Sequence, residues 1–295
     1  MRIVSWNCGG WSCGGFNLDK FNEIKRYHPQ IILIQECTKK EFDFVSKCIN
    51  EERIHIVKER EVIFKEQESN FDISKLQHWY GDNIEESHKG TAIFSSVSGN
   101  IELVENFNKE FRYVIPYKIS TYKEDECILM SIWTKLPSDG TWNYQKTIFD
   151  ALDYYNFNKP LILAGDFNTG SNKNNVQEYE ELKIKLKKYG LKNCAENTEF
   201  EYEPTFFHDN TNDYFTNDFC FIPKDFYVYE FYVDKMNNKK RWRKLSDHCP
   251  IIADFGKSAE SPRMKEEASL INSLKLALTS MGESPDDVKV STPFF

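Results

Sequence analysis

The chain has 295 residues, 40% of them hydrophobic and 15% aromatic, which is enough to bury a large core in one big domain or two small ones. Its 38 Lys and Arg against 46 Asp and Glu give a formal net charge of −8, so a polyanion site has to come from a local group of cations. No bilayer-spanning apolar run, signal peptide or C-x-x-C pair is present, and we therefore expect a reduced, cytoplasmic protein without a membrane segment, disulfides or a zinc site.

Short strand-like runs alternate with helix-like segments between residues 2 and 255. Runs rich in β-branched and aromatic residues predict strands at 2–7, 31–36, 90–96, 111–120, 127–133, 161–166, 217–222, 227–233 and 249–255. Amphipathic patterns predict helices at 18–27, 39–50, 143–156 and 176–189. Because hairpin-like neighbours occur together with crossovers, this order favours packed sheets flanked by helices over a simple parallel array.

Two regions depart from this alternation. Residues 65–88 are polar and aperiodic and are predicted to form a long loop. Residues 257–295 form a predicted extension to a domain at 1–256, with a helix inside 262–282 whose apolar stripe consists of Ile271, Leu274, Leu278 and Met281. This helix either packs on its own domain or serves as a docking element for a protein partner or a second copy of the chain.

Polar side chains stand where several of the apolar runs end or begin. They are, in chain order, Asn7, Glu36, Asp166, Asn168, Asp247 and His248. Taken singly, an Asn after a strand is more often a turn residue, and a Ser-Asp-His more often a cap beside a surface histidine. Strand ends from distant parts of a chain can meet at one edge of a sheet, so the joint pattern predicts a site on a rigid scaffold.

Glu36 is the clearest anomaly, because it closes the apolar run 31–34. A buried, unpaired carboxylate is costly, so Glu36 requires a cation or strong hydrogen-bond donors. A divalent ion such as Mg²⁺ fits, since it prefers oxygen ligands and commonly takes one or two protein carboxylates. Asp247 is the best candidate for the second carboxylate.

His248 suits proton chemistry or binding of a developing anionic oxygen, because its charge can change near neutral pH. A histidine in that role needs an orienting acceptor, and Asp218 at the edge of an aromatic strand is the candidate. Asn7 and Asn168 can donate to phosphoryl oxygens without adding charge. Asp166 can then hold or deprotonate the attacking water.

Taken together, the segments that carry these residues resemble the endonuclease/exonuclease/phosphatase superfamily of metal-dependent phosphoesterases. The matching pieces, in family order, are "VSWNCGGW", "LIQECT", "KGTAIFS", "LAGDFNTG", "NDFCFI" and "LSDHCPI". The resemblance implies an α/β fold, a four-layer α-β-β-α sandwich with two mostly antiparallel sheets. It also implies one or two Mg²⁺ or Mn²⁺ ions at Glu36, near the side chains of Asn7, Asp247, Asp166 and Asn168. In addition, it implies a phosphate-stabilising His248 paired with Asp218 and a water-positioning Asp166.

Trp133 departs from the family pattern, since many members carry a His or Tyr at the end of this strand. An indole donates one hydrogen bond and cannot exchange a proton near neutral pH. Either a neighbour such as Lys135 assists the leaving group, or the metal and His248 suffice. We predict substrate contacts for Trp133 and for His208, although His208 is equally well explained as a surface residue.

The segment 235–244, "KMNNKKRWRK", contains no acidic residue and precedes the Ser-Asp-His motif. Local cations suit a polyanionic backbone, and an interleaved aromatic can stack on an unpaired base, so we predict substrate contacts for Lys239, Lys240, Arg241, Trp242 and Arg243. A solvated basic hairpin tip is the alternative. The prediction is a nuclease for DNA, or else RNA; the alternatives are a phosphatase or phosphodiesterase for inositol phosphates, nucleotides or other small phosphoesters, and a weakly catalytic binding subunit.

Overall fold

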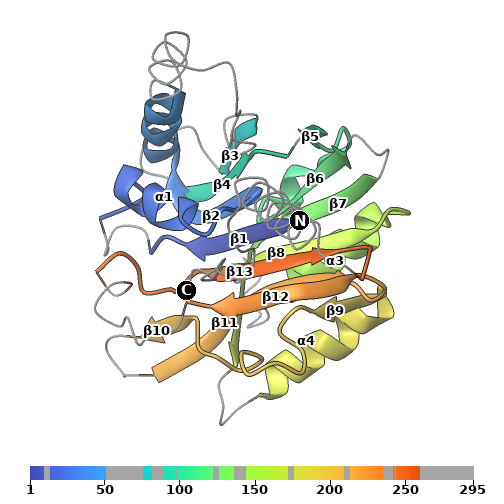
Figure 1. The fold of residues 1–295 in the computed structure, drawn as a ribbon. Helices are drawn as coiled ribbons and strands as arrows, with labels where there is room; N and C mark the ends of the chain where they lie inside the picture. The colour runs from blue at the N-terminus through green and yellow to red at the C-terminus, as the bar shows by residue number, and fades with distance from the viewer. Residues whose placement is uncertain are drawn as a thin grey trace, which may run out of the picture.

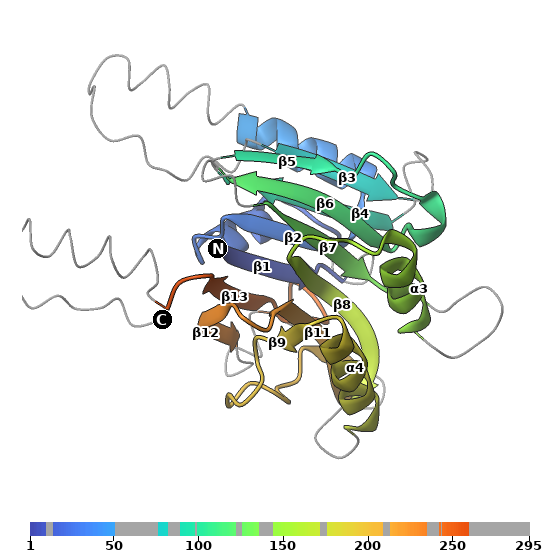
Figure 2. The same ribbon diagram turned by 90° about the vertical axis from the view of Figure 1, so that its right-hand side faces the viewer.

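The computed structural model describes residues 1–9, 14–50, 76–81, 89–97, 99–121, 126–135, 144–171, 176–208, 213–234, 242 and 244–259. Figures 1 and 2 show these residues as two β-sheets packed face to face, with helices on their outer sides. The predicted α/β sandwich is thereby confirmed. In the described part of the chain, no helix is long and apolar enough to cross a membrane.

The first sheet has the strand order β12-β13-β1-β2-β4-β3. Its strands are β12 (Tyr227–Val233), β13 (Ile251–Gly256), β1 (Arg2–Asn7), β2 (Ile31–Thr38), β4 (Lys89–Ser95) and β3 (Leu76–Gly81). β1 and β2 are parallel, and the other described pairings in this sheet are antiparallel. Helix α1 (Leu18–Lys25) and helical residues 39–50 pack against Phe94 of β4 through Phe21 and Phe42.

The second sheet has the order β10-β11-β8-β7-β6-β5, and β9 (Leu191–Asn193) also pairs with β11. Its other strands are β10 (Phe206–His208), β11 (Asp213–Pro223), β8 (Leu161–Ser171), β7 (Glu126–Trp133), β6 (Val114–Thr121) and β5 (Gly99–Leu103). β7 and β8 are parallel. Helices α3 (Lys146–Tyr155) and α4 (Gln177–Lys188) bury Ile148, Leu152, Leu182 and Leu186 in the core on the outer side of this sheet.

Side-chain alternation along β8 explains why its polar end faces the inside of the sandwich. Ile162 and Ala164 belong to the core between the sheets, whereas Leu163 and Phe167 belong to the core under α3 and α4. Because side chains two residues apart share a face of a strand, Asp166 continues the intersheet row. The strand that fills the core therefore also delivers a carboxylate between the sheets.

The structure corrects the predicted loop at 65–88, since residues 76–81 form the edge strand β3. The polar composition of this segment does not predict a strand, because contacts with other elements stabilise it. Trp79 Nε1 donates to the carbonyl oxygen of Cys37 at 2.8 Å, and His78 Nδ1 lies 2.9 Å from the Tyr117 hydroxyl. The short strands β5, β9 and β10 also lack a strong sequence pattern. β8 runs to Ser171, beyond its predicted end at residue 166.

Two further predictions concern the cysteines and the segment 257–295. The seven cysteines in the described part of the chain are free thiols. The last described strand ends at Gly256, and the helix predicted at 262–282 lies outside the described residues.

Candidate active site

Asn7 links the two sheets at the end of the sandwich where β1, β2 and β8 deliver polar side chains. It ends β1 and is buried; its Nδ2 donates to Asp166 Oδ2 at 2.9 Å and to Glu36 Oε1 at 3.2 Å. Its Oδ1 accepts from the backbone N–H of Gly9 at 3.0 Å. Asn7 therefore presents N–H groups to both carboxylates, which fits a hydrogen-bond donor better than the predicted metal ligand.

A β-bulge turns Glu36 into the site. The register of β2 against β4 shifts between Gln35 and Cys37, and Glu36 has φ 60°, a left-handed conformation that costs a non-glycine residue about 1–3 kcal/mol. Lys89, the first residue of β4, places Nζ 2.5 Å from Glu36 Oε2. Burial by itself raises the pKa of Glu36, but Lys89 and Asn7 outweigh it and hold the pKa below its usual value. Glu36 is thus ionised beside a cation.

His248 and Asp218 form a buried pair close to Asp166. His248 Nδ1 lies 2.8 Å from Asp218 Oδ2, and His248 Nε2 lies 4.0 Å from Asp166 Oδ2. The Thr205 hydroxyl accepts the backbone N–H of Asp218 at 3.1 Å, and the ring of Phe206 packs on the imidazole with 4.8 Å between centroids. The predicted orienting partner of His248 is therefore in contact with it.

The pKa values of Asp166 and His248 are strongly shifted. Burial and the negative charge of Asp218 raise the pKa of Asp166 to about 7, while His248 and Asn7 oppose the shift. Burial by itself lowers the pKa of His248, but Asp218 and Asp166 outweigh it and raise the value to about 10. At neutral pH the imidazole is cationic and Asp166 is close to its titration midpoint, which suits a charge donor and a proton acceptor.

Asn168 is held next to Asp166 by a tight local conformation. Its φ is 48°, and its backbone N–H donates to Asp166 Oδ1 at 2.9 Å. Its side-chain Nδ2 donates to the carbonyl oxygen of Thr134 at 2.9 Å, on the segment that follows β7. Asp166 and Asn168 therefore lie next to each other. The left-handed backbone conformation of Asn168, and not a regular extended strand, brings them together.

Trp133 lies opposite Asp166 in the parallel pairing of β7 and β8. It is 3% exposed, and the Tyr113 ring meets it edge-on with 5.9 Å between centroids. Lys135 places Nζ 4.0 Å from the centroid of the Trp133 ring, within the range of a cation–π interaction. The rings of Trp133 and Tyr113 therefore hold the ammonium of Lys135, which lies on the segment after β7.

Asp247 reaches this end of the sandwich from the segment before β13. The Ser246 hydroxyl donates to the backbone oxygen of Asn7 at 2.7 Å and lies 3.4 Å from Asp247 Oδ1. A Cβ atom added to Gly9 would lie 2.8 Å from Asp247 Oδ1, so this glycine leaves room for the carboxylate close to Asn7. Asp247 therefore lies beside Gly9, two residues after Asn7.

The donors around Glu36 fit a hard divalent ion. Glu36 itself offers two carboxylate oxygens, the ligand type that such ions prefer, and a lysine ammonium already compensates its charge. Within the described residues no group of three or more His, Cys, Asp or Glu is arranged to hold a metal ion. An ion bound by one or two carboxylates and water, as is common for Mg²⁺, does not require such a group.

The other residues predicted to contact the substrate differ in where they lie. His208 is exposed at the end of β10, and its ring lies 6.3 Å from that of Phe206, which in turn covers His248. Trp242 is fully buried against Trp6 and donates through Nε1 to Asp234 at 2.7 Å, so it cannot stack on a base as predicted. The remaining predicted contacts, which lie outside the described residues, are Lys239, Lys240, Arg241 and Arg243.

Neither Lys89 nor Thr205 was predicted to belong to the site. Lys89 nevertheless begins the family-matching stretch "KGTAIFS", and Thr205 lies in the stretch 203–208 that ends at His208. Their importance comes from partners far away in the chain, Glu36 for Lys89 and the backbone of Asp218 for Thr205. No local signal in the sequence reports such pairs.

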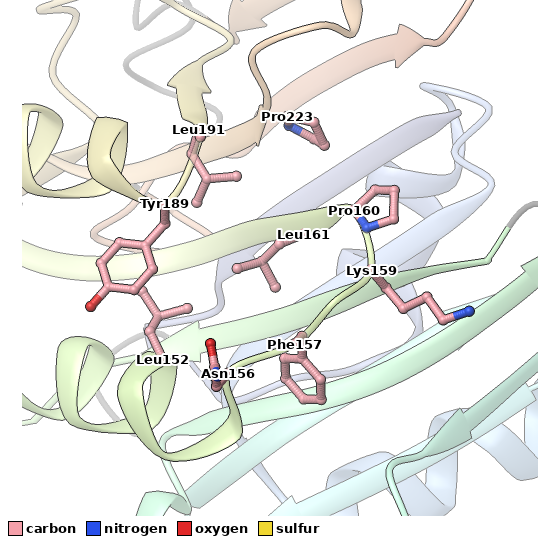
Figure 3. Close-up of a pocket in the computed structure, with 10 residues that line it drawn as sticks. Leu152, Asn156, Phe157, Lys159, Pro160, Leu161, Tyr189, Leu191 and Pro223 are labelled. Atoms are coloured by element: carbon pink, nitrogen blue, oxygen red, sulfur yellow. The ribbon is translucent and has the colours of Figure 1, made fainter.

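A separate pocket lies at the opposite end of β8 (Figure 3). It is lined by Leu152, Lys159, Leu161, Tyr189 and Leu191, together with neighbouring residues. Leu161 begins β8, whereas Asp166 lies five residues further along, about 16 Å away at the usual rise of a strand. The pocket is therefore distinct from the polar site.

The two packed sheets bring together an Asp-paired histidine, a buried aspartate and a cation-paired glutamate. A family model described as the Endonuclease/Exonuclease/phosphatase family matches residues 4–248. The chain belongs to this family, whose hydrolases act on phosphoesters. No curated protein matches the sequence significantly.

Solved structures share the fold at low sequence identity. One is an endonuclease/exonuclease/phosphatase family protein from Leptotrichia buccalis, with TM-score 0.56, 16% identity and coverage of 87% of this chain and 99% of that one. A mannosyl-6-phosphatase from Bacteroides thetaiotaomicron has TM-score 0.51, 16% identity and coverage of 87% and 99%. A 3′ phosphatase from Neisseria, bound to a product DNA hairpin, has TM-score 0.56, 15% identity and coverage of 87% and 99%.

Proposed function

We propose that the protein is a divalent-metal-dependent nuclease that hydrolyses phosphodiester bonds of DNA, with RNA as the second substrate to test. The hydrolytic part rests on one observation, the buried Asp166 between the Asn7 amide and the Asp218–His248 pair. The preference for nucleic acid is supported by the acid-free basic segment 235–244, which directly precedes the Leu-Ser-Asp-His stretch in the sequence.

The residues of the site divide the chemistry among them. Asp166, with its pKa raised to about 7, orients the attacking water and accepts its proton. His248 is cationic at neutral pH and donates from Nε2 to a phosphoryl oxygen, while Asp218 orients the ring through Nδ1. Asn168 adds an amide contact to the phosphate. In-line attack then depends mainly on positioning and charge stabilisation.

Glu36 would hold the divalent ion, with Asp247 as the second carboxylate. When bound, Mg²⁺ or Mn²⁺ supplies a positive charge that polarises the phosphoryl oxygen and offsets negative charge in the transition state. The indole of Trp133 cannot deliver a proton to the leaving group. Either Lys135, held over the Trp133 ring, assists departure of the leaving oxygen, or the ion and His248 suffice.

One substrate panel tests the proposal. The purified protein is incubated with Mg²⁺ or Mn²⁺ and plasmid, single-stranded DNA, RNA, nucleotides, inositol phosphates and mannose 6-phosphate, with His248→Ala and Glu36→Ala as controls. We expect metal-dependent cleavage of DNA that both substitutions abolish. Turnover of the small phosphates alone would replace the nuclease by a phosphatase. Absence of turnover on every substrate would favour a binding subunit.

A cytoplasmic location forms part of the proposal. Free cysteine thiols at the seven described positions support a reducing compartment. Localisation of a tagged full-length chain tests this directly, and recovery of the protein outside the cytoplasm would contradict it.

A further inference from the structure

Among the described residues, Lys89 contacts the predicted metal ligand Glu36 and has no role in the proposed reaction. Its Nζ lies 2.5 Å from Glu36 Oε2, while Asn7 Nδ2 donates to the other carboxylate oxygen at 3.2 Å. The side chains of Lys89 and Glu36 are 27% and 24% exposed, so the pair is partly accessible to solvent. Both oxygens of the carboxylate are therefore engaged while one side stays open to solvent.

The backbone of Glu36 makes this engagement important. Glu36 has a left-handed φ of 60° at the bulge, and strained conformations persist only where several contacts hold the residue. An ionised carboxylate without a cation would also lose the compensation for its partial burial. Lys89 supplies both requirements: it restrains the side chain and neutralises its charge.

A divalent ion bound at Glu36 would compete with the lysine ammonium for the carboxylate. The ammonium is a compact single charge on a flexible four-carbon stem, so it can leave the carboxylate without any change of the backbone. It comes from the first residue of β4, which is held in register by the pairing of Lys89 with Thr38 and of Gly90 with Cys37. The backbone position of Lys89 is thus secured while the ammonium can move.

We propose that Lys89 is a positioning residue that takes the place of the metal ion on Glu36 in the metal-free protein and is displaced from the carboxylate when the ion binds. This inference rests on the proposed function only in requiring a divalent ion at Glu36. Lys89 keeps the strained carboxylate charged and oriented before the ion arrives. The same contact weakens ion binding, because the ion has to displace it.

The first experiment measures ion binding directly, by Mn²⁺ titration calorimetry on the full-length protein. Lys89→Met removes the competing ammonium, and we expect Mn²⁺ to bind about tenfold more tightly, the loss of one charge-assisted contact. Lys118→Met is the matched control, because Lys118 of β6 pairs with Glu126 at 3.0 Å on the other sheet. It should leave Mn²⁺ affinity unchanged.

The second experiment uses the unmodified chain, so it does not depend on the folding of a variant. Reductive methylation of lysines, read by mass spectrometry, should modify Lys89 several-fold faster with Mn²⁺ than without it, whereas Lys118 should react equally in both states. If Mn²⁺ leaves Lys89 labelling unchanged or slows it, the lysine is an ordinary ion-pair partner and the inference is overturned.

A third variant separates this inference from the proposed function. Glu36→Gln should abolish Mn²⁺ binding if the ion sits at Glu36. Loss of binding in Glu36→Gln, together with unchanged affinity in Lys89→Met, would overturn the exchange at Lys89 and leave the metal-dependent nuclease standing. Failure of the wild-type protein to bind Mn²⁺ or Mg²⁺ would overturn both.

Discussion

Asp218 influences the protonation of two other buried residues of the site, Asp166 and His248. Asp218 raises the pKa of both Asp166 and His248, so one carboxylate prepares the proton acceptor and the cation at the same time. Asp218 Oδ1 is buried and has no hydrogen-bond partner among the described residues. Such an arrangement is costly for stability and therefore points to catalysis.

Replacement of Asp218 tests this arrangement at the residue scale. Asp218→Asn keeps the shape but removes the charge that orients and holds the imidazolium, so we expect kcat to fall about a thousandfold with little change in KM. Steady-state kinetics on the best substrate gives the two constants separately. Asp225→Asn, at an exposed turn after β11, is the matched control and should retain full activity. A rise in KM with unchanged kcat would contradict the assigned role.

Trp133 allows a second test at the residue scale, because its ring carries Lys135 but cannot transfer a proton. Trp133→Phe keeps an aromatic face, so kcat should stay within about threefold of wild type. Trp133→Ala should lower the free energy of unfolding by about 3–5 kcal/mol, since a buried aromatic is lost. Kinetics and urea denaturation measure the two effects. Inactivity of a fully stable Trp133→Phe protein would place the indole N–H in the reaction.

At the scale of elements, the close approach of β7 and β8 positions Asp166. Gly165, the residue before it, has φ 145°, and a Cβ atom added there would lie 1.9 Å from the carbonyl oxygen of Ile132. The parallel pairing of Ile132 with Gly165 and of Trp133 with Asp166 therefore requires a glycine at this position.

Gly165→Ala should destabilise the protein by about 3 kcal/mol or more, because the methyl group overlaps the backbone of β7. Gly190→Ala is the matched control: its φ is 75°, nothing lies within 4 Å of the added Cβ, and only about 1 kcal/mol of left-handed strain is expected. Urea unfolding curves compare the two. Equal losses for both variants would mean that the pairing of β7 and β8 tolerates separation.

At the scale of the whole molecule, the packing of two sheets collects polar residues from positions 7 to 248 of the chain. β1 and β2 of the first sheet contact β8 of the second, so Asn7 and Glu36 meet Asp166. Figure 2 shows these strands next to one another between the helices. The surrounding sequence then decides which phosphoester can reach this centre.

The basic segment should control polynucleotide binding. Replacing Lys239, Lys240 and Arg241 by Gln should reduce the slope of log affinity against log salt concentration by about 0.9 for each lost phosphate contact on duplex DNA. Fluorescence anisotropy across a salt series measures the slope. A matched triple Gln variant at exposed positions should leave it unchanged: Lys187, Lys188 and Lys224. An unaltered slope in the first variant would remove this segment from the substrate site.

The extension should be dispensable for the fold if it serves as a docking element. Removing residues 260–295 keeps Ser258, whose carbonyl oxygen accepts from the Tyr229 hydroxyl at 2.7 Å. We expect the shortened chain to unfold in one transition at an unchanged midpoint and to lose the mass of any bound copy or partner in light scattering. Aggregation of the shortened chain would favour a helix packed on its own domain.

The sequence by itself determined the class of fold and the family of the chain. Apolar runs and helical periodicity report local structure, and the acids, amides and histidine at strand ends kept their order and spacing, so Asp166, Asp218 and His248 were recognisable. Edge strand β3 could not be predicted from the sequence, because its own residues are polar and it is stabilised by hydrogen bonds of Trp79 and His78 to other elements.

Only the tertiary structure decided how these residues act on one another. The ion pair of Lys89 with Glu36, the burial of Trp242 and the mutual pKa shifts of Asp166 and His248 all come from residues far apart in the chain. Residue identity and spacing predict what a side chain is able to do. Burial and distance to a charged neighbour, which only the packing of the two sheets creates, determine its charge and its partner.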